Sequence, residues 1–163
     1  MDAEYFLKLD GIIGDSQDKD HAHEIDILGW SWDDYCPLSW GACASGGPPI
    51  GSGEVINVFK ALDKATSALR QYFQNGRHIA NGQFTCRRTS SRLEFFHVWF
   101  TDLQIKSVRG KERGETSGAE EEVVLKYTNY YAEYYDSGQV FHQASSKSRG
   151  LSKYPDGRDF RVW

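Results

Sequence analysis

Residues 24–32 read Glu24-Ile25-Asp26-Ile27-Leu28-Gly29-Trp30-Ser31-Trp32. Branched and aromatic residues of this kind favour extended, half-buried backbone. Side chains of a strand alternate between its two faces. The period of two therefore predicts one face with two indoles (Leu28, Trp30, Trp32) and one with smaller residues (Ile27, Gly29, Ser31). We expect a β-strand whose two indoles enter either the core or a contact between subunits.

Further strands are predicted on both sides of this run. They lie at residues 5–9, 54–60, 83–88, 92–108 and 121–135, with a short last strand at 159–163. The two longest exceed the usual strand length, so each should bend or carry a β-bulge. A polar link is expected at residues 109–120. Many strands with no alternation of strand and helix predict a mainly-β fold, an antiparallel barrel or sandwich.

One helix is predicted in the middle of the chain. Apolar residues recur at helical spacing on one face, at Ala65, Leu69, Tyr72 and Phe73. Asp63 or Thr66 can cap its start, and Gly76 stands where a left-handed residue ends a helix. Because a short amphipathic helix is unstable alone, we expect it to lie against the sheet.

Residues 33–53 interrupt the strand pattern with three prolines and several glycines. The segment nevertheless carries large apolar residues that the exposed loop of a monomer would not display together, namely Tyr35, Leu38, Trp40 and Ile50. A long apolar loop usually has a function or covers an edge. Two interpretations stay open: the loop contacts another subunit, or it folds back on its own barrel.

Size and charge limit the class of protein. The 163 residues suit a single domain, 1–163, because domains usually run to ~100–200 residues. A net charge of −4, with both signs spread along the chain, gives no reason to expect binding to nucleic acid or insertion into a membrane. The start, Met1-Asp2-Ala3-Glu4, is acidic where a signal peptide is basic, which predicts a cytoplasmic protein. Three cysteines are no disulfide framework, so reduced thiols are expected.

Residues with catalytic potential are sparse. His21 and His23 could share one face of a strand and, with Glu24, hold zinc. The simpler interpretation is a loop-to-strand boundary, since the other histidines bring no companion motif. No nucleophile elbow or phosphate-binding loop is present. We therefore expect no enzyme, metal or cofactor. The tyrosines of residues 127–135 could line a ligand groove or a wet subunit interface.

Two motifs resemble those of a known family. Residues 18–32 (Asp-Lys-Asp-His-Ala-His-Glu-Ile-Asp-Ile-Leu-Gly-Trp-Ser-Trp) resemble the signature of the haemolysin-coregulated proteins, Hcp, the inner-tube subunits of bacterial type VI secretion. Residues 59–69 resemble the family's Lys-x-x-Asp-Lys run before its helix. Arg77-His78 resembles its helix exit, and Ser107-Val108 the end of its long strand. The resemblance covers about residues 4–135.

The resemblance implies a fold and a function together. The fold is an antiparallel β-barrel of two sheets with one short flanking helix. The implied function is a homohexameric ring, stacked into the tube that a contractile sheath drives out with its spike. Export then needs no signal peptide, and effector proteins travel in the lumen. Ser31 is expected to face the lumen and contact cargo, and the loop at 33–53 to bridge stacked rings.

Alternatives from other classes remain. A monomeric ligand-binding β-barrel could use the tyrosine stretch, and a metal enzyme could use His21, His23 and Glu24. The loop is Trp-, Cys- and Pro-bearing where the family's is typically glycine-rich and polar. A ring-forming paralogue that builds no long tubes is therefore a further reading.

Overall fold

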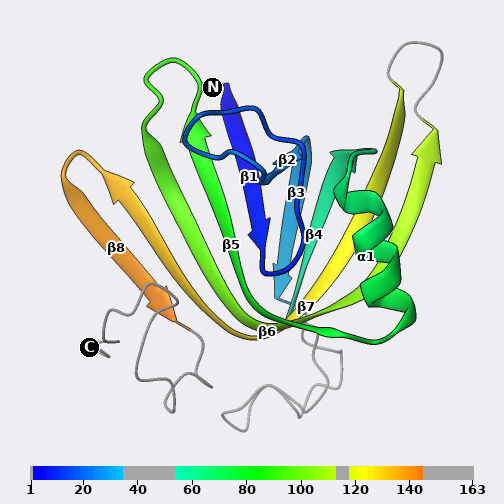
Figure 1. The fold of residues 1–163 in the computed structure, drawn as a ribbon. Helices are drawn as coiled ribbons and strands as arrows, with labels where there is room; N and C mark the ends of the chain where they lie inside the picture. The colour runs from blue at the N-terminus through cyan, green and yellow to red at the C-terminus, as the bar shows by residue number, and fades with distance from the viewer. Residues whose placement is uncertain (1, 35–53, 113–117, 145–163) are drawn as a thin grey trace, which may run out of the picture.

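The computed structural model describes residues 2–34, 54–112 and 118–144 (Figure 1). The described part contains eight strands and one helix. In chain order they are β1 (Ala3–Leu9), β2 (Ile25–Ile27), β3 (Gly29–Asp34), β4 (Glu54–Ala61), α1 (Ala65–Gln74), β5 (His78–Arg88), β6 (Glu94–Glu112), β7 (Ala119–Asp136) and β8 (Gln139–Ala144).

The strands form one antiparallel sheet that curls into a nearly closed barrel. Its order is β2-β1-β5-β6-β7-β4-β3, and β8 pairs with β7 beyond the end of β4. The barrel closes through residues 25–34, because β2 pairs with β1 at one end of the order and β3 pairs with β4 at the other. The predicted mainly-β antiparallel barrel with one helix is confirmed, but the described strands belong to one continuous sheet and not to two.

The run at residues 24–32 is not one strand. It breaks at Leu28, whose backbone N–H donates to the carbonyl of Phe59 at 2.7 Å as the chain leaves β1 for β4. Ile25 and Ile27 point into the core, whereas the Leu28 side chain is 54% exposed. The prediction that Leu28 shares a face with the two indoles is wrong, because the change of partner shifts the alternation by one residue.

The long strands carry the irregularities that their length predicts. Pairing registers shift between Cys86 and Arg87 where β5 meets β6, and between Ile105 and Ser107 where β6 meets β7. Both ends of the polar link expected at 109–120 are strand, because β6 runs to Glu112 and β7 begins at Ala119. The strand β8 was not predicted from the sequence. The predicted strand at 159–163 lies outside the described residues.

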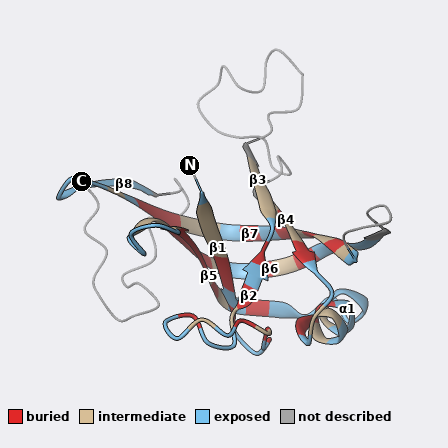
Figure 2. Cartoon of the chain, turned by 90° about the horizontal axis from the view of Figure 1, so that it is seen from above, coloured by how far each residue is buried: buried red, intermediate tan, exposed pale blue. Residues whose placement is uncertain are grey.

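The core lies inside the barrel. Its buried apolar residues come mainly from β1, β2, β4, β5, β6, β7 and α1, and buried positions are coloured red in Figure 2. In α1, Ala65 and Leu69 are buried and Tyr72 is half-buried, but Phe73 is 45% exposed, so its assignment to the inner face is wrong. Asp63 and Thr66 share the start of the helix: the Asp63 carboxylate accepts from the Ala65 N–H, and the Thr66 hydroxyl accepts from the Asp63 N–H. Gly76 has the left-handed φ of 60° that was expected. Among the described residues, no helix is long and apolar enough to span a membrane.

Candidate functional site

Ser31 lies on the outer face of the barrel wall. It sits in β3 opposite Asn57 of β4, and the Asn57 side-chain amide donates to the Ser31 hydroxyl at 3.3 Å. The register continues the row through Val124 of β7 to Ser107 of β6. These four half-buried, uncharged side chains cross four strands on one face. Such a row can exchange hydrogen bonds with a partner without burying a charge, and a buried charge would cost far more than a buried hydroxyl or amide.

Trp30 and Trp32 point the other way, into the barrel. The Trp30 ring lies 5.1 Å from Phe84, and the Trp32 ring 4.9 Å from Tyr130. The Trp32 indole N–H donates to the Tyr127 hydroxyl at 2.6 Å. Both indoles therefore pack against the core of their own chain.

Tyr35, Leu38, Trp40 and Ile50 lie outside the described residues, so their assignment to ring stacking stays a prediction. The described strands fix where that segment starts and ends. Asp34, the last residue of β3, pairs with Glu54, the first residue of β4. The segment therefore leaves and re-enters the barrel wall at one point, at the end of a two-stranded ladder.

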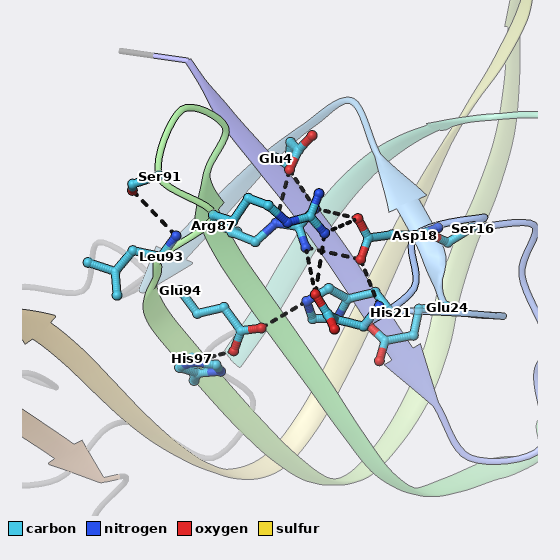
Figure 3. Close-up of polar contacts among 12 residues, drawn as sticks. Glu4, Ser16, Asp18, His21, Glu24, Arg87, Ser91, Leu93, Glu94 and His97 are labelled. Atoms are coloured by element: carbon cyan, nitrogen blue, oxygen red, sulfur yellow. Dashed lines mark hydrogen bonds and ion pairs between the residues drawn. The ribbon is translucent and has the colours of Figure 1, made fainter.

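The first motif of the resemblance builds an ionic cluster around Arg87 (Figure 3). The Arg87 guanidinium donates to Glu4 at 2.7 and 3.0 Å and to both oxygens of Asp18 at 2.6 and 3.0 Å. Arg92 adds a bond to Asp18 at 2.9 Å. These hydrogen bonds, first of all those from Arg87, hold the pKa of Asp18 far below its usual value. The loop at residues 15–24 is thereby fastened to the outer face of β1 and β5.

His21 forms the second half of that attachment. Its ring stacks on Phe6 with centroids 4.0 Å apart, and each ring nitrogen lies 3.0 Å from a carboxylate, Glu24 on one side and Glu94 on the other. His97 is largely buried, and its Nε2 lies 3.2 Å from the second oxygen of Glu94. Burial outweighs the nearby histidine and raises the pKa of Glu24.

The zinc hypothesis fails on geometry. His21 is buried, whereas His23 is exposed in a turn with φ of 65°, so the two do not share a strand face. Within the described ranges, no group of three or more His, Cys, Asp or Glu side chains is placed to hold a metal ion. The described cysteine, Cys86, is buried, and burial raises the pKa of its thiol to about 12.

The second motif builds a separate cluster inside the barrel, around Lys60. Its ammonium lies 2.8 Å from Glu121 and 2.6 Å from Asp63, and the Thr66 hydroxyl donates to the same Glu121 oxygen at 2.8 Å. Lys60 and Glu121 are fully buried. Neither residue was predicted from the sequence; the available signal was the alternation Ile56, Val58, Lys60, which puts the lysine on the inward face of β4.

The tyrosines of residues 127–135 do not gather in one groove. Tyr127 is inside the barrel with Trp32, whereas Tyr131 lies on the outer face beside His142. A groove of about 520 Å³ opens elsewhere, between the start of β1, the 15–24 loop and Leu28, and its lining includes the carboxylates of Glu4, Asp18 and Asp26. Two of these already hold Arg87. The ligand-binding alternative therefore loses the tyrosine site on which it was based.

The ion pairs described above join segments of the barrel to one another, and the outer row through Ser31 is uncharged. The family model described as "Type VI secretion system effector, Hcp" matches residues 6–134. The chain belongs to this family of secreted, tube-forming proteins of type VI secretion, which is a structural and not an enzyme family.

Individual members of the family are similar to this chain in sequence or structure over most of its length. Protein hcp1 of Pseudomonas aeruginosa is 27% identical over 136 residues, which cover 82% of this chain and 84% of that protein. The crystal structure of Hcp1 from Salmonella typhimurium matches with a TM-score of 0.74 at 25% identity, covering 88% of this chain and 94% of that one. A type VI secretion system effector from Yersinia pestis matches with a TM-score of 0.71 at 29% identity, covering 86% and 98%.

Proposed function

We propose that this chain assembles into a ring of six identical subunits, and that these rings stack into the inner tube of a type VI secretion apparatus. The observation that carries the proposal is the match of the whole described barrel, and not of one motif, to secreted tube-forming proteins. A closed ring of one subunit needs two different, complementary surfaces on each copy. A rigid barrel can present these on opposite sides of one wall.

The partners of such a tube follow from its place in the machine. The spike caps the tube and the contractile sheath surrounds it, so both contact this chain during export. The protein is made in the cytoplasm and leaves the cell through the apparatus. Its whole length, residues 1–163, acts as one barrel domain with the segment at about 33–53 as an extension.

Stacking is assigned to that extension. Tyr35, Leu38, Trp40 and Ile50 supply apolar surface at a point where the segment leaves and re-enters the barrel wall. An interface between rings gains most of its affinity from a few large apolar side chains. Trp30 and Trp32 hold the β3 strand beneath it against the core.

The row through Ser31 is proposed as the lumen surface that holds effector proteins. Its support is chemical: four uncharged side chains on one outer face, with a hydroxyl and an amide at its centre. A surface of this kind contacts many different cargo proteins weakly, which suits a tube that must release them.

Light scattering on purified protein, with negative-stain images of the same peak, tests the assembly. We expect a mass six times that of the 18.6 kDa chain and rings with a central hole. A clean monomer at high concentration would overturn the proposal. Rings that never stack at any concentration would identify a paralogue that builds no long tubes.

Two variants separate cargo from stacking. Ser31→Gln should keep rings intact but retain less effector in a pull-down, while the same change at Ser91, in the turn before β6, should retain as much as the parent. Deleting residues 35–49 should abolish stacking and leave single rings. Equal cargo on both serine variants refutes the lumen assignment, and a deletion that unfolds the subunit makes the loop part of the core.

A further inference from the structure

One patch of the barrel's outer face is buried although it points away from the core. Trp99 of β6 pairs with Gln83 of β5, which in turn pairs with Lys8 of β1, and Lys8 is exposed. The neighbouring residue Val98 is fully buried inside the barrel, so Trp99 faces outward. Tyr131 lies opposite Trp99 on β7 and shares that face.

The degree of burial is that of a core. Trp99 is 8% exposed, Tyr131 6% and Glu133 4%. In the described part of the chain, the ring contacts of Trp99 are to His97 at 5.5 Å and Tyr131 at 5.9 Å, both on the same face. Glu133 accepts from the hydroxyls of Tyr131 and Tyr135 on its own strand. Neighbours within one face shield the edges of a ring but leave its outer side to solvent, so this burial requires a cover.

The described elements outside the sheet are anchored elsewhere. The 15–24 loop is fixed over β1 and the start of β6, where His21 stacks on Phe6 and reaches Glu94. The turn after α1 contacts β6 at Gln104, whose side-chain amide donates to the carbonyl of Gly76. Beside Trp99 and Tyr131, the Thr101 hydroxyl and the Asn129 carbonyl oxygen are also buried, and neither has a hydrogen-bond partner among the described residues. Buried polar atoms of this kind are normally satisfied.

We propose that residues 145–163 of the same chain lie across this aromatic outer patch, which we define as His97, Trp99, Tyr131 and Glu133. The last residue of β8, Ala144, pairs with Tyr131, so the segment begins at the patch itself. Its 19 residues can extend to roughly 60 Å, far more than the patch requires.

The composition of the segment fits the patch. It carries five basic residues against two acidic ones, and its apolar residues are Leu151, Tyr154, Phe160, Val162 and Trp163. The patch offers aromatic rings for the apolar residues and the buried Glu133 carboxylate, with Glu94 nearby, for the basic ones. Backbone amides and carbonyls of the segment can satisfy Thr101 and Asn129. We assign the segment to its own barrel because the cover starts where β8 ends.

Limited trypsin digestion of the full-length protein tests this directly. Lys147, Arg149 and Lys153 lie in the segment, so mass spectrometry follows its release. Trp99→Ala removes the largest ring of the patch and should speed cleavage at these sites at least about tenfold, since cleavage follows the population of the undocked state. Val124→Ala, a truncation elsewhere on the outer face of β7, should cleave at the parent rate. Equal rates for the two variants would overturn the proposal.

A second measurement needs no substitution. Hydroxyl-radical labelling of the folded parent should modify Trp99 slowly, and cleavage of the segment by trypsin should raise that rate several-fold while the barrel stays folded by circular dichroism. An unchanged rate after cleavage refutes the assignment. Protection that disappears on dilution would place the segment of one copy on its neighbour and refute docking on its own barrel.

Discussion

The Arg87 cluster and the Lys60 cluster both neutralise a buried cation, but their carboxylates differ in exposure to water. Each surrounds a nearly fully buried cation with carboxylates, Glu4 and Asp18 for Arg87, Glu121 and Asp63 for Lys60. The Arg87 partners come from the rim of the barrel, and Glu4 is 40% exposed. Glu121 is completely buried. Water can therefore help to compensate a lost partner in the outer cluster but not in the inner one.

Because the two clusters differ in exposure to water, we expect them to stabilise different parts of the molecule. The outer cluster holds a loop on the sheet, and the loop can detach without opening the core. The inner cluster joins β4, β7 and the start of α1 beneath the barrel wall, where an unpaired charge would be left in an apolar environment. We expect damage to the inner cluster to be global and damage to the outer cluster to be local.

The largest effect should follow from Glu121→Gln. The change removes the buried negative charge opposite Lys60 and should lower the free energy of unfolding by about 3 kcal/mol, the usual cost of breaking one side of a buried pair. Urea unfolding followed by circular dichroism measures it. The double variant Lys60→Met/Glu121→Leu should recover much of the loss; if the double variant is as unstable as the single one, packing rather than unpaired charge is the cause.

Arg87→Lys should cost less, about 2 kcal/mol, because lysine keeps the charge but cannot donate in parallel to two carboxylates. The same urea experiment measures the loss, and hydrogen exchange should show faster opening confined to the loop at residues 15–24. Arg92→Lys, on a half-exposed side chain, is the matched control and should behave as the parent. Opening throughout the barrel would show that the outer cluster also supports the core.

The outer cluster should also weaken in acid. The folded-state pKa of Asp18 lies below its unfolded value, so its contribution is present above about pH 4 and is lost as pH falls below that. The gap in urea midpoint between the parent and Asp18→Asn should therefore be widest near neutrality and shrink by about pH 3. Glu24, with its raised pKa, shifts stability in the opposite sense and acts equally in both proteins. A gap that is constant with pH would contradict the assignment.

We expect the smallest change in stability from the exposed ion pair between Lys64 and Asp15. Lys64 pairs with Asp15 at 3.0 Å with both side chains exposed, and Lys64 lowers the pKa of that carboxyl. Exposed pairs contribute little to stability. Lys64→Ala should leave the urea midpoint within error of the parent, and a clear loss would mean that the loop is held by more than the Arg87 and His21 contacts.

Much of the barrel could be predicted from local patterns. The strands at 5–9, 54–60 and 121–135 are present within a few residues, and the helix and the left-handed Gly76 are where the spacing put them. Two features were missed for a shared reason. Leu28 and Phe73 are apolar and periodic but exposed, because periodicity marks a face without saying what covers it.

The site was predicted in part. The motif at residues 18–32 pointed to the family, yet its Asp18 and His21 serve internal attachment, and their partners Arg87 and Glu94 lie more than sixty residues away. No spacing rule links residues so far apart. The signal for Lys60, its place in an inward-facing alternation, was available but cannot name Glu121 as the partner.

The sequence by itself determined most of the extended segments, the position of the predicted helix, and which family the chain resembles. These depend on backbone preference and on side-chain alternation, which act over a few residues. The tertiary structure alone decided that the chain changes partner at Leu28, which cations are buried, and which outward residues are covered. Those outcomes depend on barrel closure, because only closure brings distant strands to one face and removes their charges from water.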